Sequence, residues 1–154
     1  MATHPLDLTV TQAKEATEEV YQACQRLIPQ LTSANPPPTP ADLVLLVSSG
    51  SSVLFIARHV DFGDEIIGMA TLALYRVPTG LRAYIEDVVV EERARRRGVG
   101  EALTRACLDQ AAQAGAHQVT LTSNPKRVAA NQLYQRMGFE LRRTNVYCYR
   151  FARG

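Results

Sequence analysis

The chain has 154 residues, of which 46% are hydrophobic, so it can bury one core and has the usual length of one domain. Its formal net charge is only +2, from 17 basic and 15 acidic residues, which argues against nucleic-acid and membrane-surface proteins as classes. No apolar run reaches the roughly 20 residues that span a bilayer, and residues 1–7 have neither the basic region nor the apolar core typical of a signal peptide. The three cysteines lack metal or disulfide spacing. We therefore expect a single cytoplasmic domain of residues 1–154.

An early strand and a helix are predicted before residue 32. Leu8–Val10 has the apolar character of a short strand. Four apolar residues recur at helical spacing and predict a helix that starts near Thr11; they are Val20, Cys24, Leu27 and Leu31. Pro29 should kink or end this helix, because proline lacks the N–H group that a helix needs.

A proline-rich loop and a second helix follow. Residues 32–40 read T-S-A-N-P-P-P-T-P, which predicts a surface loop that is too short to separate two domains. Thr39, Pro40 and Asp42 form the pattern of a helix start, with a capping side chain, a proline at the first helical position and an early acid. We expect this helix to end near Gly50.

Three strands are predicted next. Residues 53–58 and 66–77 are rich in β-branched and apolar side chains, and the D-F-G-D between them predicts an antiparallel hairpin. The turn P-T-G leads to a third strand over residues 83–90. Strict alternation predicts that one of its faces carries Tyr84, Glu86, Val88 and Val90, and the other Ile85, Asp87 and Val89.

The segment R-R-R-G-V-G, residues 95–100, links this strand to a helix that Gly115 should end. A short strand from Val119 to Leu121 completes a strand–helix–strand unit, whose two strands are expected to be parallel. Gly98 and Gly100 let successive backbone N–H groups converge, and the helix N-terminus adds unpaired amides and the positive end of its dipole. With Arg93, Arg95, Arg96 and Arg97 this segment predicts a phosphate-binding loop.

The C-terminal part predicts a last helix and two closing strands. Asn124-Pro125 should cap the helix, whose buried stripe would be Ala129, Leu133 and Met137 and which Gly138 should end. Residues 139–151 then predict two strands. The fold class is therefore α/β of the α+β kind, a mixed and mostly antiparallel sheet with one parallel pair, flanked by about four helices.

Three known kinds of phosphate-binding loop could account for this segment. A P-loop requires Lys-Ser or Lys-Thr after its glycines, and a dinucleotide fingerprint requires a third glycine; both are missing. The pattern V-x-x-x-x-R-x-x-G-x-G, at Val90, Arg95, Gly98 and Gly100, resembles the acetyl-coenzyme A loop of the GNAT N-acetyltransferase superfamily. The segment A-A-N-Q-L-Y-Q-R-M-G-F, residues 129–139, is similar to a second motif of that family.

The resemblance implies a GNAT-like fold with a splayed parallel strand pair and acetyl-CoA as cosubstrate. The pantetheine arm would pair with the backbone of Val88 to Val90, including Val89, in the gap between the strands. The diphosphate would meet the backbone amides of residues 96–101 and the side chains of Arg95 and Arg96. The expected diphosphate contacts are Arg95, Arg96, Arg97, Gly98, Val99, Gly100 and Glu101.

The resemblance also suggests catalytic groups for direct attack of a primary amine on the thioester in a ternary complex. Tyr134 matches the family's usual acid, which protonates or hydrogen-bonds the departing thiolate; the alternative is a core tyrosine. Glu86 is the candidate base, although some members carry a glutamate where this chain has Tyr84, and Glu86 could instead orient a cationic amine or simply be solvated. Asn131 is the favoured additional coenzyme contact, with an exposed polar role as the alternative.

The acceptor would be a small-molecule amine or a protein or peptide amine, and no metal is expected. A domain that binds acetyl-CoA without turnover, as a sensor or a partner-binding subunit, is the alternative function. Nucleic-acid binding is a third, which the lack of aromatic residues among the arginines disfavours. A homodimer through the final strands is common in similar domains and is possible here.

Overall fold

The structure is a computed structural model that describes residues 7–152. The chain divides into two compact units, Met1–Thr122 (unit 1) and Ser123–Gly154 (unit 2). No helix of residues 7–152 is long and apolar enough to cross a membrane.

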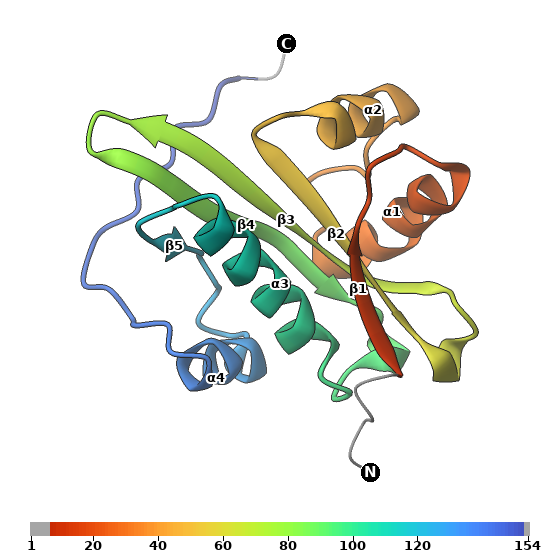
Figure 1. The fold of residues 1–154 in the computed structure, drawn as a ribbon. Coiled ribbons are helices and arrows are strands. Elements are labelled where there is room, and N and C mark those ends of the chain that lie inside the picture. Colours follow the sequence, from red (N-terminus) through yellow and green to blue (C-terminus); the bar gives the residue numbers. More distant parts are fainter. Residues whose placement is uncertain (1–6, 153–154) are drawn as a thin grey trace. The chain divides into compact units, whose positions relative to one another are not determined.

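Unit 1 is built on one five-stranded sheet in the order β1-β2-β3-β4-β5 (Figure 1). All neighbouring strands are antiparallel except β4 and β5, which are parallel, so the predicted mixed sheet with one parallel pair is confirmed. In chain order its elements are β1 (Leu8–Gln12), α1 (Glu18–Leu31), α2 (Pro40–Ser48), β2 (Ser52–His59), the 3-10 turn η1 (Val60–Phe62), β3 (Ile66–Val77), β4 (Gly80–Val90), the 3-10 turn η2 (Glu92–Ala94), α3 (Val99–Gln113) and β5 (Val119–Thr120).

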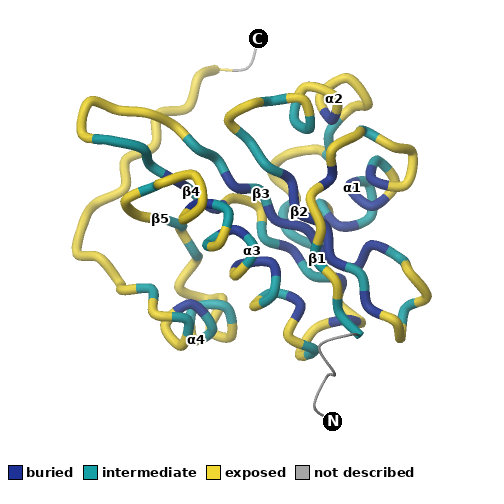
Figure 2. The backbone as a smooth tube through the Cα atoms, viewed as in Figure 1, coloured by how far each residue is buried: buried dark blue, intermediate teal, exposed yellow. Residues whose placement is uncertain are grey.

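Both faces of the sheet are covered by helices. One face packs against α1 and α2 in a single buried cluster that includes Leu27, Leu43 and Met69. Gly68, the neighbour of Met69, faces the opposite way and lies against Val99 of α3, which crosses in front of the sheet in Figure 1. Figure 2 shows the buried residues concentrated in the central strands and on the sides of the helices that face them.

The start of α1 differs from the prediction near Thr11. Thr11 lies in β1 and pairs with Ile56 of β2, and the helix begins at Glu18. Its N-cap is Thr17, whose hydroxyl accepts a hydrogen bond from the N–H of Val20. The prediction was wrong because pairing with β2 keeps the chain extended up to Gln12, and the apolar helical spacing that begins at Val20 does not define where the helix starts.

The prediction for α2 is confirmed. Thr39 and Asp42 form a capping box in which each side chain accepts a hydrogen bond from the other residue's backbone N–H. Pro29, by contrast, does not stop α1 at once, because the helix continues to Leu31.

Unit 2 contains α4 (Val128–Arg136). The prediction that Asn124 caps this helix is wrong. The N-cap is Arg127; Asn124 forms a tight turn instead, in which its side-chain oxygen accepts from the N–H of Lys126. Ala129, predicted to be buried, is exposed, while Leu133 and Met137 are partly buried.

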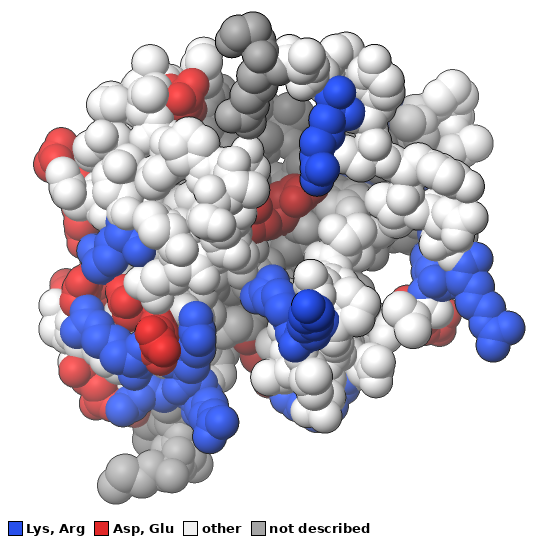
Figure 3. All heavy atoms as spheres, turned by 180° about the vertical axis from the view of Figure 1, so that it is seen from behind, with Lys and Arg blue, Asp and Glu red and all other residues white. Residues whose placement is uncertain are grey.

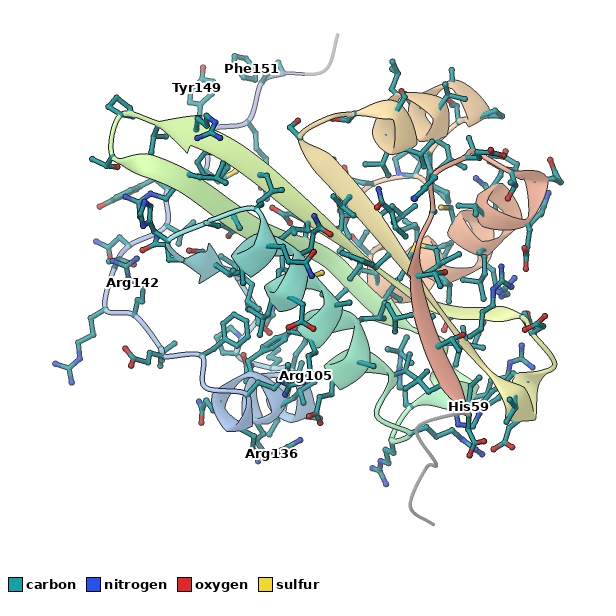
Figure 4. All side chains as sticks on the ribbon, in the orientation of Figure 1. His59, Arg105, Arg136, Arg142, Tyr149 and Phe151 are labelled. Carbon is teal, nitrogen blue, oxygen red and sulfur yellow. The ribbon has the colours of Figure 1, made fainter. Side chains whose placement is uncertain are left out.

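The segment that follows α4, residues 139–152, forms no strand in the described chain, so the prediction of two closing strands is wrong. Its residues are exposed from Glu140 onward, as the colour of the tube in Figure 2 shows, and Tyr149 and Phe151, labelled in Figure 4, contact each other edge to face. Alternating β-branched and aromatic residues favour a strand, but a strand also needs a neighbouring ladder for its N–H and C=O groups.

We predict that Gly68→Ala destabilises the fold, because an added Cβ would lie 3.0 Å from Val99 Cγ1 and 3.1 Å from both Leu103 Cδ1 and the carbonyl oxygen of Val89. Overpacking of this kind costs about 1–3 kcal/mol, which urea unfolding would measure. Gly50→Ala is the matched control, since nothing lies within 4 Å of a Cβ there. Equal stability of the two variants would contradict the close packing of α3.

Candidate active site

The edge of β4 that faces β5 is paired over only two residues. The ladder joins Ala83 to Val119 and Tyr84 to Thr120, and ends there. From Ile85 to Val90 the described chain offers this edge no ladder partner, while the other edge of β4 stays paired with β3. The parallel ladder is therefore very short, and beyond it β4 has backbone groups that another extended chain could pair with.

A β-bulge at Asp87 decides which residues use that open edge. Met69 pairs with Val89 and Thr71 with Glu86, so β4 has one residue more than β3 in this interval. Asp87 takes a left-handed conformation, with φ of 52°.

The bulge also changes the direction of the backbone groups. Before it, the N–H of Ala83 donates to Gln118 on the β5 side at 3.2 Å. After it, the N–H of Glu91 donates to Ile67 on the β3 side at 2.8 Å. Val88 and Val90 therefore direct their backbone groups to the open edge, where strict alternation from Ala83 would have placed Asp87 and Val89.

The same bulge overturns the predicted faces of the strand. Glu86 shares its face with Thr71 and Val89, not with Val88 and Val90. Val89 belongs to the cluster under α1 and α2, so Glu86 lies on the face that these helices cover. Its side chain is exposed, and partial burial together with the neighbouring charge of Asp87 raises the pKa of its carboxyl group.

The glycine-rich loop has the backbone shape of an anion site. Arg96 and Gly98 both have positive φ, 64° and 77°, while Arg97 between them does not, so the backbone alternates in handedness over these three residues. Gly98 is the N-cap of α3 and makes no side-chain cap. The first helical hydrogen bond runs from Ala102 to the carbonyl of Gly98, so the amides of Val99, Gly100 and Glu101 have no partner within the helix.

The four arginines of the loop are not equivalent. Arg93 and Arg97 form ion pairs, with Glu65 and Asp61 respectively. Arg95 and Arg96 make no hydrogen bond or ion pair with the described part of the chain. Only the latter two guanidinium groups are therefore available to an anion without displacing a carboxylate.

A buried carboxylate fixes the chain just before the loop. Glu91, only 8% exposed, accepts hydrogen bonds from Arg26 Nε at 2.9 Å and from Gln30 Nε2 at 2.7 Å. Gln30 Oε1 accepts from the N–H of Glu92 at 3.0 Å, and Arg26 donates to the carbonyl of Ile66 at 2.6 Å. Helix α1 thus holds the end of β4 and the start of β3 together.

Tyr134 and Asn131 lie on α4 in unit 2. Tyr134 is buried and its ring contacts that of Phe139 at a centroid distance of 5.7 Å. The side-chain amide of Asn131 donates to the carbonyls of Asn124 and Arg127, at 2.9 and 3.0 Å. Asn131 therefore serves the first turn of α4, and its carbonyl oxygen is the part that a ligand could use.

The cysteines of unit 1 are suited to packing and not to nucleophilic chemistry. Burial raises the pKa of Cys24, and that of Cys107 to about 12, so both remain thiols near neutral pH. Residues 7–152 contain no group of three or more His, Cys, Asp or Glu side chains arranged to hold a metal ion.

Sequence reasoning missed Glu91, its partners on α1 and the bulge at Asp87. The polar residues Arg26 and Gln30 stand four apart between apolar positions, which was the available sign that this helix carries a buried polar contact. The bulge had no sequence sign, because neither glycine nor asparagine marks it.

Residues 14–139 match the family described as the Acetyltransferase (GNAT) family. The chain belongs to the GNAT acetyltransferase family. No curated protein matches the sequence.

Solved structures extend this likeness over nearly the whole chain. An acetyltransferase from Trypanosoma brucei is 25% identical, with a TM-score of 0.71 over 93% of this chain and 99% of the other. An aminoglycoside acetyltransferase from an uncultured soil metagenomic sample, in complex with trehalose, is 18% identical, with a TM-score of 0.80 over 97% and 99%. AAC(6')-Iy, bound to a CoA-containing bisubstrate analog, is 20% identical, with a TM-score of 0.75 over 94% and 98%. At the two lower identities the likeness shows the GNAT fold.

We predict that Glu91→Gln destabilises the protein at neutral pH. Burial alone would raise the pKa of Glu91, but the hydrogen bonds from Gln30 and Arg26 and the nearby positive charges outweigh it and lower the pKa. The ionised form therefore stabilises the fold above the ordinary value of 4.5, and this contribution is lost as pH falls through the lowered pKa.

Urea unfolding near neutral pH should show a loss of about 1–3 kcal/mol for Glu91→Gln, shrinking in acid. Glu19→Gln is the control, since Glu19 pairs with Arg58 at the surface and such pairs contribute up to about 1 kcal/mol. A loss for Glu91→Gln that does not depend on pH would argue against the charge as its cause.

Proposed function

We propose that this chain is an acetyl-CoA-dependent N-acetyltransferase in which residues 1–154 act as one domain. The observation that carries the proposal is that the strand with an unpaired edge, β4, leads directly into a loop with the backbone shape of an anion site. Val88 and Val90 offer backbone groups at that edge, and the amides of Val99 to Glu101 follow at the helix start. A pantetheine arm with a diphosphate at one end requires this combination.

The acetyl group would pass directly from sulfur to nitrogen. The amine nitrogen attacks the thioester carbonyl, a C–N bond forms, and the C–S bond breaks. Glu86 accepts the proton that the amine loses, directly or through water, and Tyr134 gives a proton or hydrogen bond to the departing thiolate. A backbone N–H at the open edge, from Val88 or Val90, polarises the carbonyl oxygen.

The acceptor we propose is a cationic primary amine, most simply a small molecule. Glu86 and Asp87 are adjacent and exposed, so this part of β4 is locally negative. An amine that arrives protonated would be attracted there before it loses its proton. Two of the structural relatives are also described with small-molecule ligands, an aminoglycoside acetyltransferase and AAC(6')-Iy with its acetylneamine analog.

Coenzyme binding can be tested with a pair of glycines at the two ends of α3. Gly98 and Gly115 both have left-handed conformations, φ 77° and 80°, and nothing lies within 4 Å of an added Cβ at either. Alanine at each position should cost similar stability, about 1 kcal/mol, from the backbone alone. Only Gly98→Ala would place a side chain where the diphosphate approaches.

Acetyl-CoA at a hundred times its dissociation constant should stabilise the wild type by roughly 2.7 kcal/mol in a thermal-shift measurement. We expect Gly115→Ala to keep this stabilisation and Gly98→Ala to lose most of it. No stabilisation of the wild type would refute the proposed function. Binding without thiol release across a broad panel of amines would indicate a sensor instead of an enzyme.

The catalytic roles predict distinct rate effects. Tyr134→Phe and Glu86→Gln should each lower kcat by about 10²–10⁴-fold while acetyl-CoA affinity is kept. As a base, Glu86 must be ionised, so the wild-type rate should fall as pH drops through its raised pKa. Asp87→Asn removes the neighbouring charge and should lower that pKa, moving the acid limb to lower pH. If Glu86→Gln keeps the same acid limb, another group is the base.

A further inference from the structure

The turn between β2 and β3 contacts the arginines of the loop. Arg93 and Arg97 lie over the ring of Phe62, with their guanidinium carbons 5.3 and 5.1 Å from its centroid. Arg97 also pairs with Asp61, and Arg93 with Glu65. Acidic and basic side chains are intermingled at this end of unit 1 in the lower left of Figure 3.

This turn is itself held in place by a buried histidine. His59, labelled in Figure 4, is 3% exposed, and its Nδ1 accepts a hydrogen bond from the N–H of Asp61 at 3.1 Å. Its ring meets that of Phe62 edge to face at 6.0 Å. Gly63 ends the turn in a left-handed conformation, with its N–H donating to the carbonyl of Val60. Phe62 and Asp61 are therefore presented on a short, internally bonded turn.

The contacts divide the arginines into two pairs. Arg93 and Arg97 are each held by one carboxylate and by the shared face of Phe62. Arg95 and Arg96, which lie between them in the sequence, have neither kind of contact within the described residues. The loop is thus held to the turn on both sides of Arg95 and Arg96, the two arginines without such contacts.

We propose that Phe62 and Asp61 are positioning residues for the diphosphate loop, with Arg93 and Arg97 as its anchors and Arg95 and Arg96 as the side chains that meet the phosphates. This inference rests on the proposed function. Arg97 then contributes its backbone amide to the ligand while its guanidinium stays on the turn.

The physical gain is preorganisation. A loop with glycines at two of six positions loses much conformational freedom when it binds an anion, and this loss weakens binding. Holding Arg93 and Arg97 on a rigid ring fixes the chain before the ligand arrives. The benefit should therefore apply to ligands that carry the diphosphate and be absent for ligands that lack it.

The test compares coenzyme A with pantetheine, the same arm without phosphates. Dissociation constants for both are measured by calorimetry on the full chain, using direct titration for coenzyme A and displacement for pantetheine. The variants are Phe62→Leu, which removes the aromatic face, and Phe62→Tyr, which keeps it. Arg97→Lys keeps the charge but loses the planar guanidinium. Arg82→Lys, at the far end of β4, is the control for an Arg-to-Lys change outside the loop.

We expect Phe62→Leu to weaken coenzyme A binding about tenfold, since two cation–π contacts are lost, and to leave pantetheine binding unchanged. Phe62→Tyr and Arg82→Lys should bind both ligands as the wild type does. Phe62→Leu and Arg97→Lys combined should weaken binding by little more than Phe62→Leu alone, because Phe62→Leu already removes the ring contact that Arg97→Lys alters.

Equal losses for coenzyme A and pantetheine would overturn the inference, because they would indicate general damage to the fold. Additive effects of Phe62→Leu and Arg97→Lys would overturn it too, since Arg97 would then act on the ligand independently. Tighter coenzyme A binding by Phe62→Leu would also overturn it, because the contacts with the turn would then keep Arg93 and Arg97 away from the ligand. A wild type that does not bind coenzyme A would refute the proposed function itself.

Discussion

The rest of the site depends on backbone hydrogen bonds that β4 leaves unmade. A buried or half-buried strand normally pairs both edges, because an unpaired N–H or C=O group away from water is costly. Here the ladder to β5 stops after Tyr84, and the bulge at Asp87 turns the groups of Val88 and Val90 to the open edge. An extended ligand that completed the sheet at this edge would run along β4 towards the loop.

Two kinds of charge contact then fix where β4 ends and the loop begins. Glu91 is buried and accepts hydrogen bonds from the half-buried Arg26 and Gln30, so removing these partners would leave a buried carboxylate without compensation. The contacts of Arg93 and Arg97 are exposed, and each contributes little to stability on its own. The first kind holds the sheet and α1 together, whereas the second kind can tune the loop without endangering the fold.

The parts of this arrangement that could be predicted from sequence are those with local chemistry. Gly98, Gly100 and the arginines identify the loop, and Thr39 with Asp42 identifies a helix start, because in each case neighbouring residues determine the structure. The late start of α1 and the missing strands of residues 139–152 depend on pairing with distant segments, which no local pattern encodes. Asp87 is the extreme case. Its left-handed conformation, which the sequence does not indicate, places Glu86 on the opposite face of β4 from Val88 and Val90.

The loop's amides are only as well placed as the helix that carries them, and the position of that helix depends on Gly68. Val99 and Leu103 approach β3 so closely that a Cβ at residue 68 would lie within about 3 Å of both. Val99 is also the first residue of α3, and its amide is the first of the three without a helical partner. The absence of a side chain at Gly68 therefore determines how closely α3 approaches the sheet, and with it the position of the unpaired amides beside the open edge of β4. Val99 thus belongs both to the buried core and to the proposed diphosphate site. This explains how a site made of backbone amides can be rigid.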